Sequence, residues 1–146
     1  MEATEPIHIL LVEDNDGDIL LIEEAFEEAK LMNKVSIVKD GEKAIHFLTR
    51  QADFSDAGTP DLILLDVNLP RKNGHEVLEF VKTNEMLKHI PVIMLTTSSS
   101  DKDVLKSYKN HANCYITKPV EVEEFLKAIT KIKNFWINLV KLPREA

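Results

Sequence analysis

The chain has 146 residues, of which 44% are hydrophobic and 29% charged, and its net charge is -7. This length and composition are typical of one globular domain and exclude disordered and collagen-like chains. The negative charge argues against nucleic acid as a partner, because phosphate backbones would be repelled. No apolar run reaches the roughly 18 residues that a membrane span needs, and the polar first residues exclude a secretory signal. The single cysteine, Cys114, fits a reducing cytoplasm. We therefore expect a cytoplasmic protein.

Short β-prone runs alternate along the chain with segments of helical periodicity. The predicted strands are residues 7–12, 35–38, 62–65, 91–95 and 114–116. Apolar residues at helical spacing follow them near residues 19–29, 44–48, 77–81, 104–108 and 121–139. A βα unit repeated about five times predicts an α/β fold, in which a parallel sheet carries helices on both faces. No linker divides the chain, and residues 51–60 are predicted to form a surface loop.

Polar side chains follow four of these strands directly. Because ligands bind outside the carboxyl ends of the strands in such a sheet, these side chains should share one edge. They are Glu13 and Asp14 after the first strand, Asp66 after the third, Thr96 after the fourth and Lys118 after the last. The second strand ends in residues 39–41, Lys-Asp-Gly, which a turn alone explains.

Three carboxylates at one edge would repel one another, at a cost of roughly 4 kcal/mol for two charges about 4 Å apart at an effective dielectric near 20. Mg²⁺ would relieve that repulsion, since it prefers oxygen ligands and retains several waters. The alternative is that these acids are solvated loop residues or helix caps. Asn15 and Asp16 are expected to cap the helix that follows.

Lys118 and Thr96 each allow two interpretations. Lys118 is either a solvated lysine before Pro119 or a partner of Asp66 that then binds a phosphoryl oxygen. A cis Lys118–Pro119 bond, which only X–Pro sequences form at low cost, is one way to aim its amine inward. Thr96 is either a β-branched strand terminus or a hydroxyl donor to a group on Asp66.

The ordered set of short motifs resembles the receiver domain of bacterial response regulators. The resemblance runs from about residue 7 to residue 132 and is carried by Glu13-Asp14, by residues 65–70 (Leu-Asp-Val-Asn-Leu-Pro) followed by Gly74, by Thr96, and by residues 115–119 (Tyr-Ile-Thr-Lys-Pro). It implies a flavodoxin-like, doubly wound fold of five parallel strands in the order 2-1-3-4-5. It also implies two-component signalling by phosphorylation, in a domain that is no enzyme but promotes its own phosphorylation and dephosphorylation.

The resemblance assigns a role to each motif residue. Asp66 would accept the phosphoryl group from a sensor histidine kinase, and Thr96 and Lys118 would bind its oxygens. Asp14 and Asp66 would ligate Mg²⁺ directly, Glu13 would act through water, and Asn68 would use its backbone carbonyl. Tyr115 would be the aromatic switch that moves with Thr96. The alternative for Tyr115 is a strand-end aromatic that packs on the last helix.

The C-terminal residues depart from the common receiver pattern, in which the chain ends near the fifth helix. Residues 134–143 continue it, and with residues 113–119 they resemble the stand-alone response regulators that partner bacterial phytochromes. That subgroup implies a phytochrome as the sensor kinase. Its members dimerise through this region, so we expect a single receiver domain over residues 1–146 with a C-terminal extension, 134–146. The surplus of apolar side chains there predicts a homodimer interface that includes Phe135, Trp136, Leu139 and Leu142.

Two other functions remain open from the sequence. A small Mg²⁺-dependent phosphatase of the haloacid dehalogenase type also uses a strand-end aspartate, but it needs a second carboxylate where this chain has Asn68. An interaction module of receiver fold that works without phosphorylation is harder to exclude. Phosphorylation by a small phosphodonor distinguishes these alternatives.

Overall fold

The structure, a computed structural model, describes residues 7–29, 33–51, 54–97, 112, 114–124 and 127. Five parallel strands form one sheet in the order β2-β1-β3-β4-β5. Their bounds are β1 Ile7–Val12, β2 Asn33–Val38, β3 Leu62–Asp66, β4 Val92–Thr96 and β5 Cys114–Thr117. The predicted fold and strand order are confirmed, and the bounds of each predicted strand agree with the observed bounds to within two residues.

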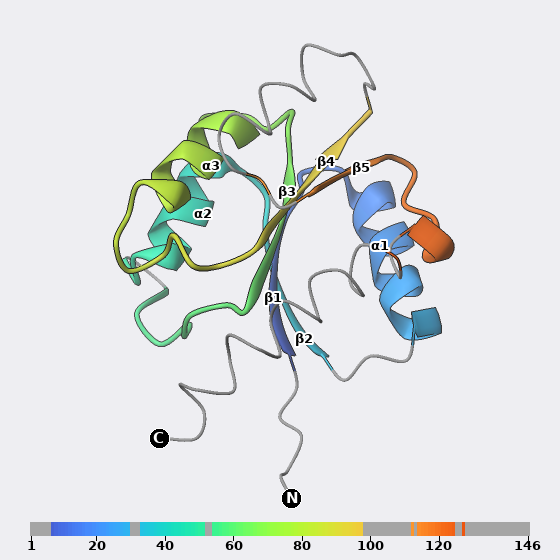
Figure 1. Ribbon diagram of the computed structural model, residues 1–146, viewed down its shortest axis with the longest axis horizontal. Coiled ribbons are helices and arrows are strands. Elements are labelled where there is room, and N and C mark those ends of the chain that lie inside the picture. The colour runs from blue at the N-terminus through green and yellow to red at the C-terminus, as the bar shows by residue number, and fades with distance from the viewer. Residues whose placement is uncertain are drawn as a thin grey trace, which may run out of the picture.

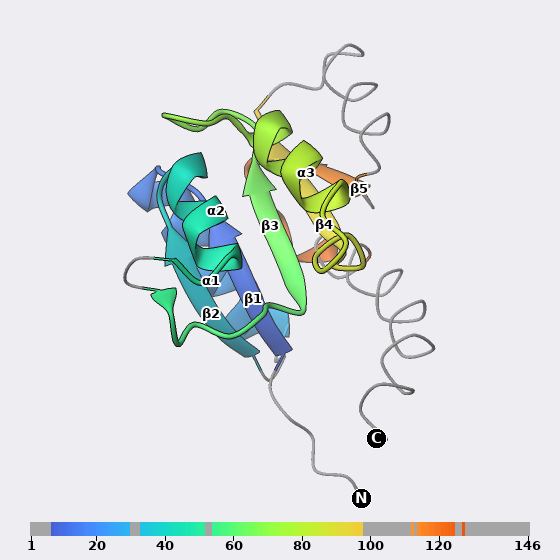
Figure 2. The ribbon, with the colours of Figure 1, turned by 90° about the vertical axis from the view of Figure 1, so that its left-hand side faces the viewer.

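Three described helices flank the sheet: α1 Asp16–Ala29, α2 Gly41–Leu48 and α3 Gly74–Lys82. Figures 1 and 2 show α2 and α3 together on one face of the sheet and α1 on the other. Side chains start two of these helices: Asp40 accepts from the backbone N–H of Lys43, and Asn73 forms a capping box with Glu76. Such caps satisfy N–H groups that have no partner inside the helix.

The pleat of the central strands divides the core into two layers. In β1, Leu10 and Val12 pack on the α2–α3 side, whereas Ile9 and Leu11 pack on the α1 side. β3 alternates in the same way, as successive side chains of a strand must. Both strands are buried on both faces, so their sequences are almost continuously apolar, and the first charged residues occur only where the strands end.

Several predictions concern residues outside the described ones. These are the helix near residues 104–108, most of the helix over 121–139, the extension 134–146 and the four predicted interface residues Phe135, Trp136, Leu139 and Leu142.

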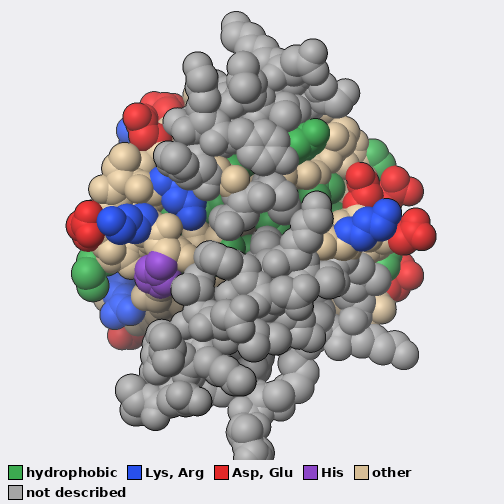
Figure 3. All heavy atoms as spheres, in the orientation of Figure 1, with side chains coloured by type: hydrophobic (Ala, Val, Ile, Leu, Met, Phe, Trp, Pro, Cys, Tyr) green, Lys and Arg blue, Asp and Glu red, His purple; other side chains and the backbone are tan. Residues whose placement is uncertain are grey.

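Among the residues that the structure does describe, no helix has both the length and the apolar character to cross a membrane. Figure 3 shows mostly acidic side chains over the α1 side and both signs of charge over the α2–α3 side.

Candidate functional site

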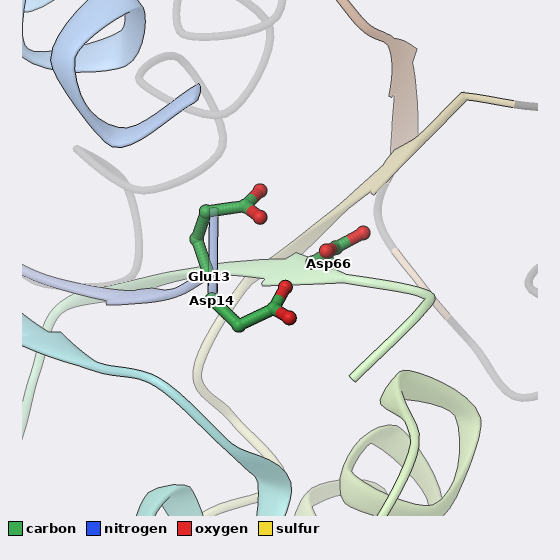
Figure 4. A group of neighbouring side chains, drawn as sticks. All are labelled: Glu13, Asp14 and Asp66. Atoms are coloured by element: carbon green, nitrogen blue, oxygen red, sulfur yellow. The ribbon is translucent and has the colours of Figure 1, made fainter. Parts of the chain in front are cut away.

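Three carboxylates meet where the two central strands end. Glu13 and Asp14 follow β1, and Asp66 is the last residue of β3, with one oxygen from each carboxylate within 4.8 Å of the others (Figure 4). Glu13 is fully buried and Asp66 is 3% exposed, whereas Asp14 is exposed. The predicted acidic cluster is therefore present, and its oxygen donors suit a hard divalent cation.

The ammonium group of Lys118 lies among these carboxylates. Its Nζ donates to Glu13 Oε1 at 2.8 Å and to Asp18 Oδ2 at 2.9 Å, and lies 3.4 Å from Asp66 Oδ2. Only 7% of the Lys118 side chain is exposed. The backbone N–H of Lys118 donates to the carbonyl of Thr96 at 2.7 Å, and the Lys118–Pro119 bond is cis, one of the arrangements that the sequence allowed. Lys118 is thus no solvated lysine, and its pairing with Asp66 is confirmed.

Burial shifts the charge balance of this cluster. Desolvation raises the pKa of Glu13 to about 7 despite its bond to Lys118, and the negative charge of Asp66 adds to the rise. Desolvation likewise raises the pKa of Asp66, against the opposing effect of the Lys118 charge. For Lys118, burial alone would lower the pKa, but hydrogen bonds to Glu13 and Asp18 outweigh it and raise the pKa. Burial thus makes the ionised forms of Glu13 and Asp66 costly, and the charge of Lys118 offsets that cost only in part.

The remaining predicted site residues lie around this cluster. The backbone N–H of Asn68 donates to Asp66 Oδ1 at 3.2 Å. Thr96 is buried at the end of β4, one residue beyond Leu95, which pairs with Asp66 in the sheet. Tyr115, in β5, is half-buried and packs against the core cluster on the α2–α3 side. The switch role of Tyr115 and the phosphoryl-binding role of Thr96 stay predictions.

Asp18 is the site residue that sequence reasoning missed. It stands in the first turn of α1, and its carboxylate reaches Lys118 across 100 positions of sequence. Acids near the start of a helix are common, so the sequence pattern alone does not distinguish Asp18 as a site residue. Asn15 does act as a cap, because its Oδ1 accepts from the N–H of Asp18 at 2.9 Å. Asp16 is instead the first residue of α1 and pairs with Lys39.

Comparison with known proteins settles which family this arrangement represents. The response regulator receiver domain matches residues 9–130, which is most of the chain. The chain belongs to the response regulator receiver family. Its site residues therefore lie at the carboxyl edge of a receiver domain, a module of two-component signalling.

Relatives resemble this receiver over nearly its whole length. Response regulator Rcp1 of Synechocystis sp. (strain PCC 6803) is 42% identical over 142 residues, 97% of each chain. A probable methanogenesis regulatory protein, FilR2 of Methanothrix harundinacea, is 39% identical over 146 residues, covering 100% of this chain and 94% of FilR2. The likeness therefore extends over nearly the whole length of both relatives.

Solved structures show the same fold. The phosphorylated cyanobacterial phytochrome response regulator RcpA superimposes with a TM-score of 0.78 at 42% identity, covering 91% of this chain and 95% of RcpA. Rcp1 in a Mn²⁺-bound form gives a TM-score of 0.76 at 43% identity, covering 90% and 94%. Relatives of this receiver have thus been observed both phosphorylated and with a divalent cation bound.

Proposed function

We propose that Asp66 accepts a phosphoryl group from the phosphohistidine of a sensor kinase. The observation that carries this proposal is the buried Asp66 carboxylate with the Lys118 ammonium 3.4 Å away. An oxygen of Asp66 attacks the phosphorus, the N–P bond breaks as the O–P bond forms, and the imidazole of the kinase leaves. Such transfers need positioning and charge neutralisation more than covalent help from the protein.

Lys118 and the loop after Asp66 supply the positioning. Two of the three Lys118 N–H bonds are directed at Glu13 and Asp18, and the Asp66 carboxylate lies within reach of the third, which would pass to a phosphoryl oxygen once that group is on Asp66. The N–H of Asn68 holds Oδ1 of Asp66, so Oδ2 is the oxygen we assign as the nucleophile. We propose that Thr96 donates to the phosphoryl group once it is formed and that Tyr115 responds to this change.

The acidic cluster fits Mg²⁺, which when bound would neutralise negative charge on the phosphoryl oxygens. Both oxygens of Glu13 already accept hydrogen bonds, one from Lys118 and one from the backbone N–H of Asn15 at 3.2 Å. Glu13 would therefore act through water, whereas Asp14 and Asp66 would ligate the ion directly. We assign the remaining protein ligand to the backbone carbonyl of Asn68. The Mn²⁺-bound form of Rcp1 supports binding of a divalent cation by this chain, and the acidic cluster supports this edge as its place.

The test of the acceptor is Asp66→Asn, which keeps the shape of the side chain but removes the nucleophilic oxygen. Wild type incubated with a small phosphodonor and Mg²⁺ should gain the mass of one phosphoryl group, and Asp66→Asn should gain none. Asp61→Asn is the matched control: Asp61 lies just before the other end of β3, where it accepts from the backbone N–H of His8. An unlabelled wild type would favour an interaction module that works without phosphorylation.

We further propose that the kinase is a phytochrome and that the receiver works in the cytoplasm. The description of RcpA as a phytochrome response regulator supports a phytochrome as the kinase. FilR2 is instead described as a probable methanogenesis regulatory protein. Phosphotransfer from a phytochrome histidine kinase should therefore be faster than from a histidine kinase with a different sensor. Equal rates from both kinases would argue against a phytochrome partner.

A homodimer through residues 134–146 is a proposal that rests on the sequence, because Phe135, Trp136, Leu139 and Leu142 lie outside the described residues. The match to the receiver family ends at residue 130, which is consistent with a separate role for this extension. Light scattering at micromolar concentration should give a dimer for the full chain. A chain that ends at residue 134 should be a monomer that still accepts phosphate at Asp66.

A further inference from the structure

The loop between β3 and α3, residues 67–73, lies beside the site but has little contact with the core. Asn68, Pro70, Arg71 and Lys72 are exposed, and only Val67 and Leu69 pack against the core. A loop that presents a backbone carbonyl to a cation needs a fixed position, because a displacement of about 1 Å can cost up to about 100-fold in rate. Something other than the core must therefore hold it.

Gly41, the first residue of α2, lies directly against this loop. A Cβ atom at Gly41 would be 1.9 Å from the carbonyl oxygen of Lys72 and 2.8 Å from the Lys72 Cβ. The N–H of Gly41 also donates to the carbonyl of Pro70 at 3.4 Å. The backbone of Gly41 is outside the left-handed region, so glycine is needed here for space and not for conformation.

Two carboxylates beside Gly41, those of Asp40 and Glu42, contact the same loop through Arg71. Arg71 has a φ of 69°, a conformation that non-glycine residues seldom adopt. Its guanidinium lies 3.7 Å from Asp40 Oδ2 and 3.6 Å from Glu42 Oε1. The other oxygen of Asp40 accepts from the N–H of Lys43 and begins α2. A single carboxylate thus starts the helix and contacts the loop.

The far end of the loop is fixed against Asp66 itself. A Cβ atom at Gly74 would be 2.2 Å from the carbonyl oxygen of Asp66, and the N–H of Gly74 donates to the carbonyl of Val67 at 2.9 Å. The loop cannot yield at this end without moving the phosphoryl acceptor. A displacement at Lys72 must therefore be taken up between Asn68 and Arg71.

We propose that the first turn of α2 positions the β3–α3 loop, with Gly41 as a positioning residue for cation binding and phosphoryl transfer at Asp66. This inference rests on the proposed function, because it assigns Asn68 to the cation. It also corrects the sequence interpretation, in which a turn alone explained residues 39–41. Asp40 is explained by its role as the cap of α2. The absence of a side chain at Gly41 is explained by the close approach of the Lys72 carbonyl.

The test is Gly41→Ala in the full chain, with Mg²⁺ affinity measured by calorimetry and phosphorylation followed with a small phosphodonor. Alanine is the better helix former, so α2 itself should not suffer. Restoring an ordinary contact of 3.4 Å would move the Lys72 carbonyl by about 1.5 Å. We expect Mg²⁺ to bind about tenfold more weakly, the lower end of what outer-shell changes cost. The deficit in phosphorylation rate should shrink as Mg²⁺ approaches saturation.

Gly58→Ala is the matched control, because Gly58 has a φ of 78° and nothing within 4 Å of its added Cβ. It should lower the melting temperature by backbone strain alone and leave Mg²⁺ affinity unchanged. If Gly41→Ala binds Mg²⁺ and phosphorylates like wild type, the inference is overturned. A wild type that binds no Mg²⁺ would instead overturn the proposed function, so the two failures are distinguishable.

Arg71→Asn decides the matter if Gly41→Ala does not fold. Asparagine tolerates the left-handed backbone, and the substitution removes only an exposed guanidinium. Exposed ion pairs contribute little, so we expect Mg²⁺ to bind about two- to threefold more weakly. Unchanged affinity in a folded Arg71→Asn would overturn the inference.

Discussion

Two lysine amines, that of the buried Lys118 side chain and that of the half-buried Lys82, lie at opposite edges of the sheet and have different partners. At the carboxyl edge, the amine of Lys118 contacts the carboxylates of Glu13, Asp18 and Asp66. At the amino edge, the amine of Lys82 donates to two backbone carbonyls, of Lys88 at 3.1 Å and of Ile90 at 2.7 Å. Contact with carboxylates raises the pKa of Lys118, whereas burial lowers the pKa of Lys82.

The difference shows how partners decide what a buried charge does. Carbonyl groups satisfy the hydrogen bonds of an ammonium but leave its charge unbalanced, so Lys82 serves to close the connection between α3 and β4. Carboxylates balance the charge of the ammonium. When all three carboxylates around Lys118 are ionised, they carry more negative charge than the lysine neutralises, and a bound cation would neutralise the remainder. Lys82 at the amino edge therefore has a structural role. At the carboxyl edge, a charge added by a cation or a phosphoryl group changes the stability of the folded protein.

The largest effect expected is that of Lys118→Gln. This variant removes the charge that would stabilise the phosphoryl oxygens, and losing such a donor costs about 100-fold in rate. It also leaves buried carboxylates without their partner, which should lower the free energy of unfolding by about 3 kcal/mol in metal-free buffer at pH 8. Phosphorylation by a small phosphodonor and chemical denaturation check the two results. A phosphorylation rate within a few-fold of wild type would contradict the role of Lys118.

The next effect concerns the pH dependence of stability without a cation. The pKa of Glu13 is raised from 4.5 to about 7 and that of Asp66 is also raised, so the folded state binds more protons than the unfolded state between these values. The stabilisation that these two carboxyl groups contribute is then fully present below about pH 4.5, and it is lost as the pH rises through about 7. We expect the decrease to be on the order of 1–3 kcal/mol, measured by denaturation in EDTA.

Saturating Mg²⁺ is the control for this pH dependence. A cation binds the ionised carboxylates of the folded state and should raise stability most at high pH, where those carboxylates repel one another. The decline toward pH 8 should therefore flatten. A metal-free protein that is more stable at pH 8 than at pH 5.5 would contradict the assigned shifts.

The sequence predicted the fold and the core of the site for one physical reason. Apolar runs identify buried strands, and parallel strands bring Asp14, Asp66 and Lys118 to one edge whatever the details of packing. It could not predict Asp18 or the contact between Gly41 and Lys72, because each joins elements whose separation is set by the finished packing. The same holds for Lys82, which in the sequence is one more lysine at the end of a helix.

A smaller effect is expected for Lys82→Met at the amino edge. The variant keeps the aliphatic stem but leaves the carbonyls of Lys88 and Ile90 without this donor. The free energy of unfolding should fall by about 1–2 kcal/mol, which corresponds to a few degrees in melting temperature. Phosphorylation and Mg²⁺ affinity should be unchanged, in contrast to Lys118→Gln. A loss of phosphorylation in a folded Lys82→Met would remove the distinction between the two edges.

The smallest effect expected is at His8, also at the amino edge, and its sign opposes that of the carboxylates. Burial lowers the pKa of His8, with a further contribution from the charge of Lys34, and its Nε2 lies 2.9 Å from Ser36 Oγ. The unfolded chain therefore takes up a proton more readily, and stability should decrease as the pH falls below 6.5. In wild type this decrease partly offsets the gain from Glu13 and Asp66. His8→Gln, which can still bond to Ser36, should remove it, so that the metal-free protein gains more stability between pH 7 and pH 5. Melting curves of both proteins at matched pH check the difference, and parallel curves would show that His8 contributes nothing to the pH dependence.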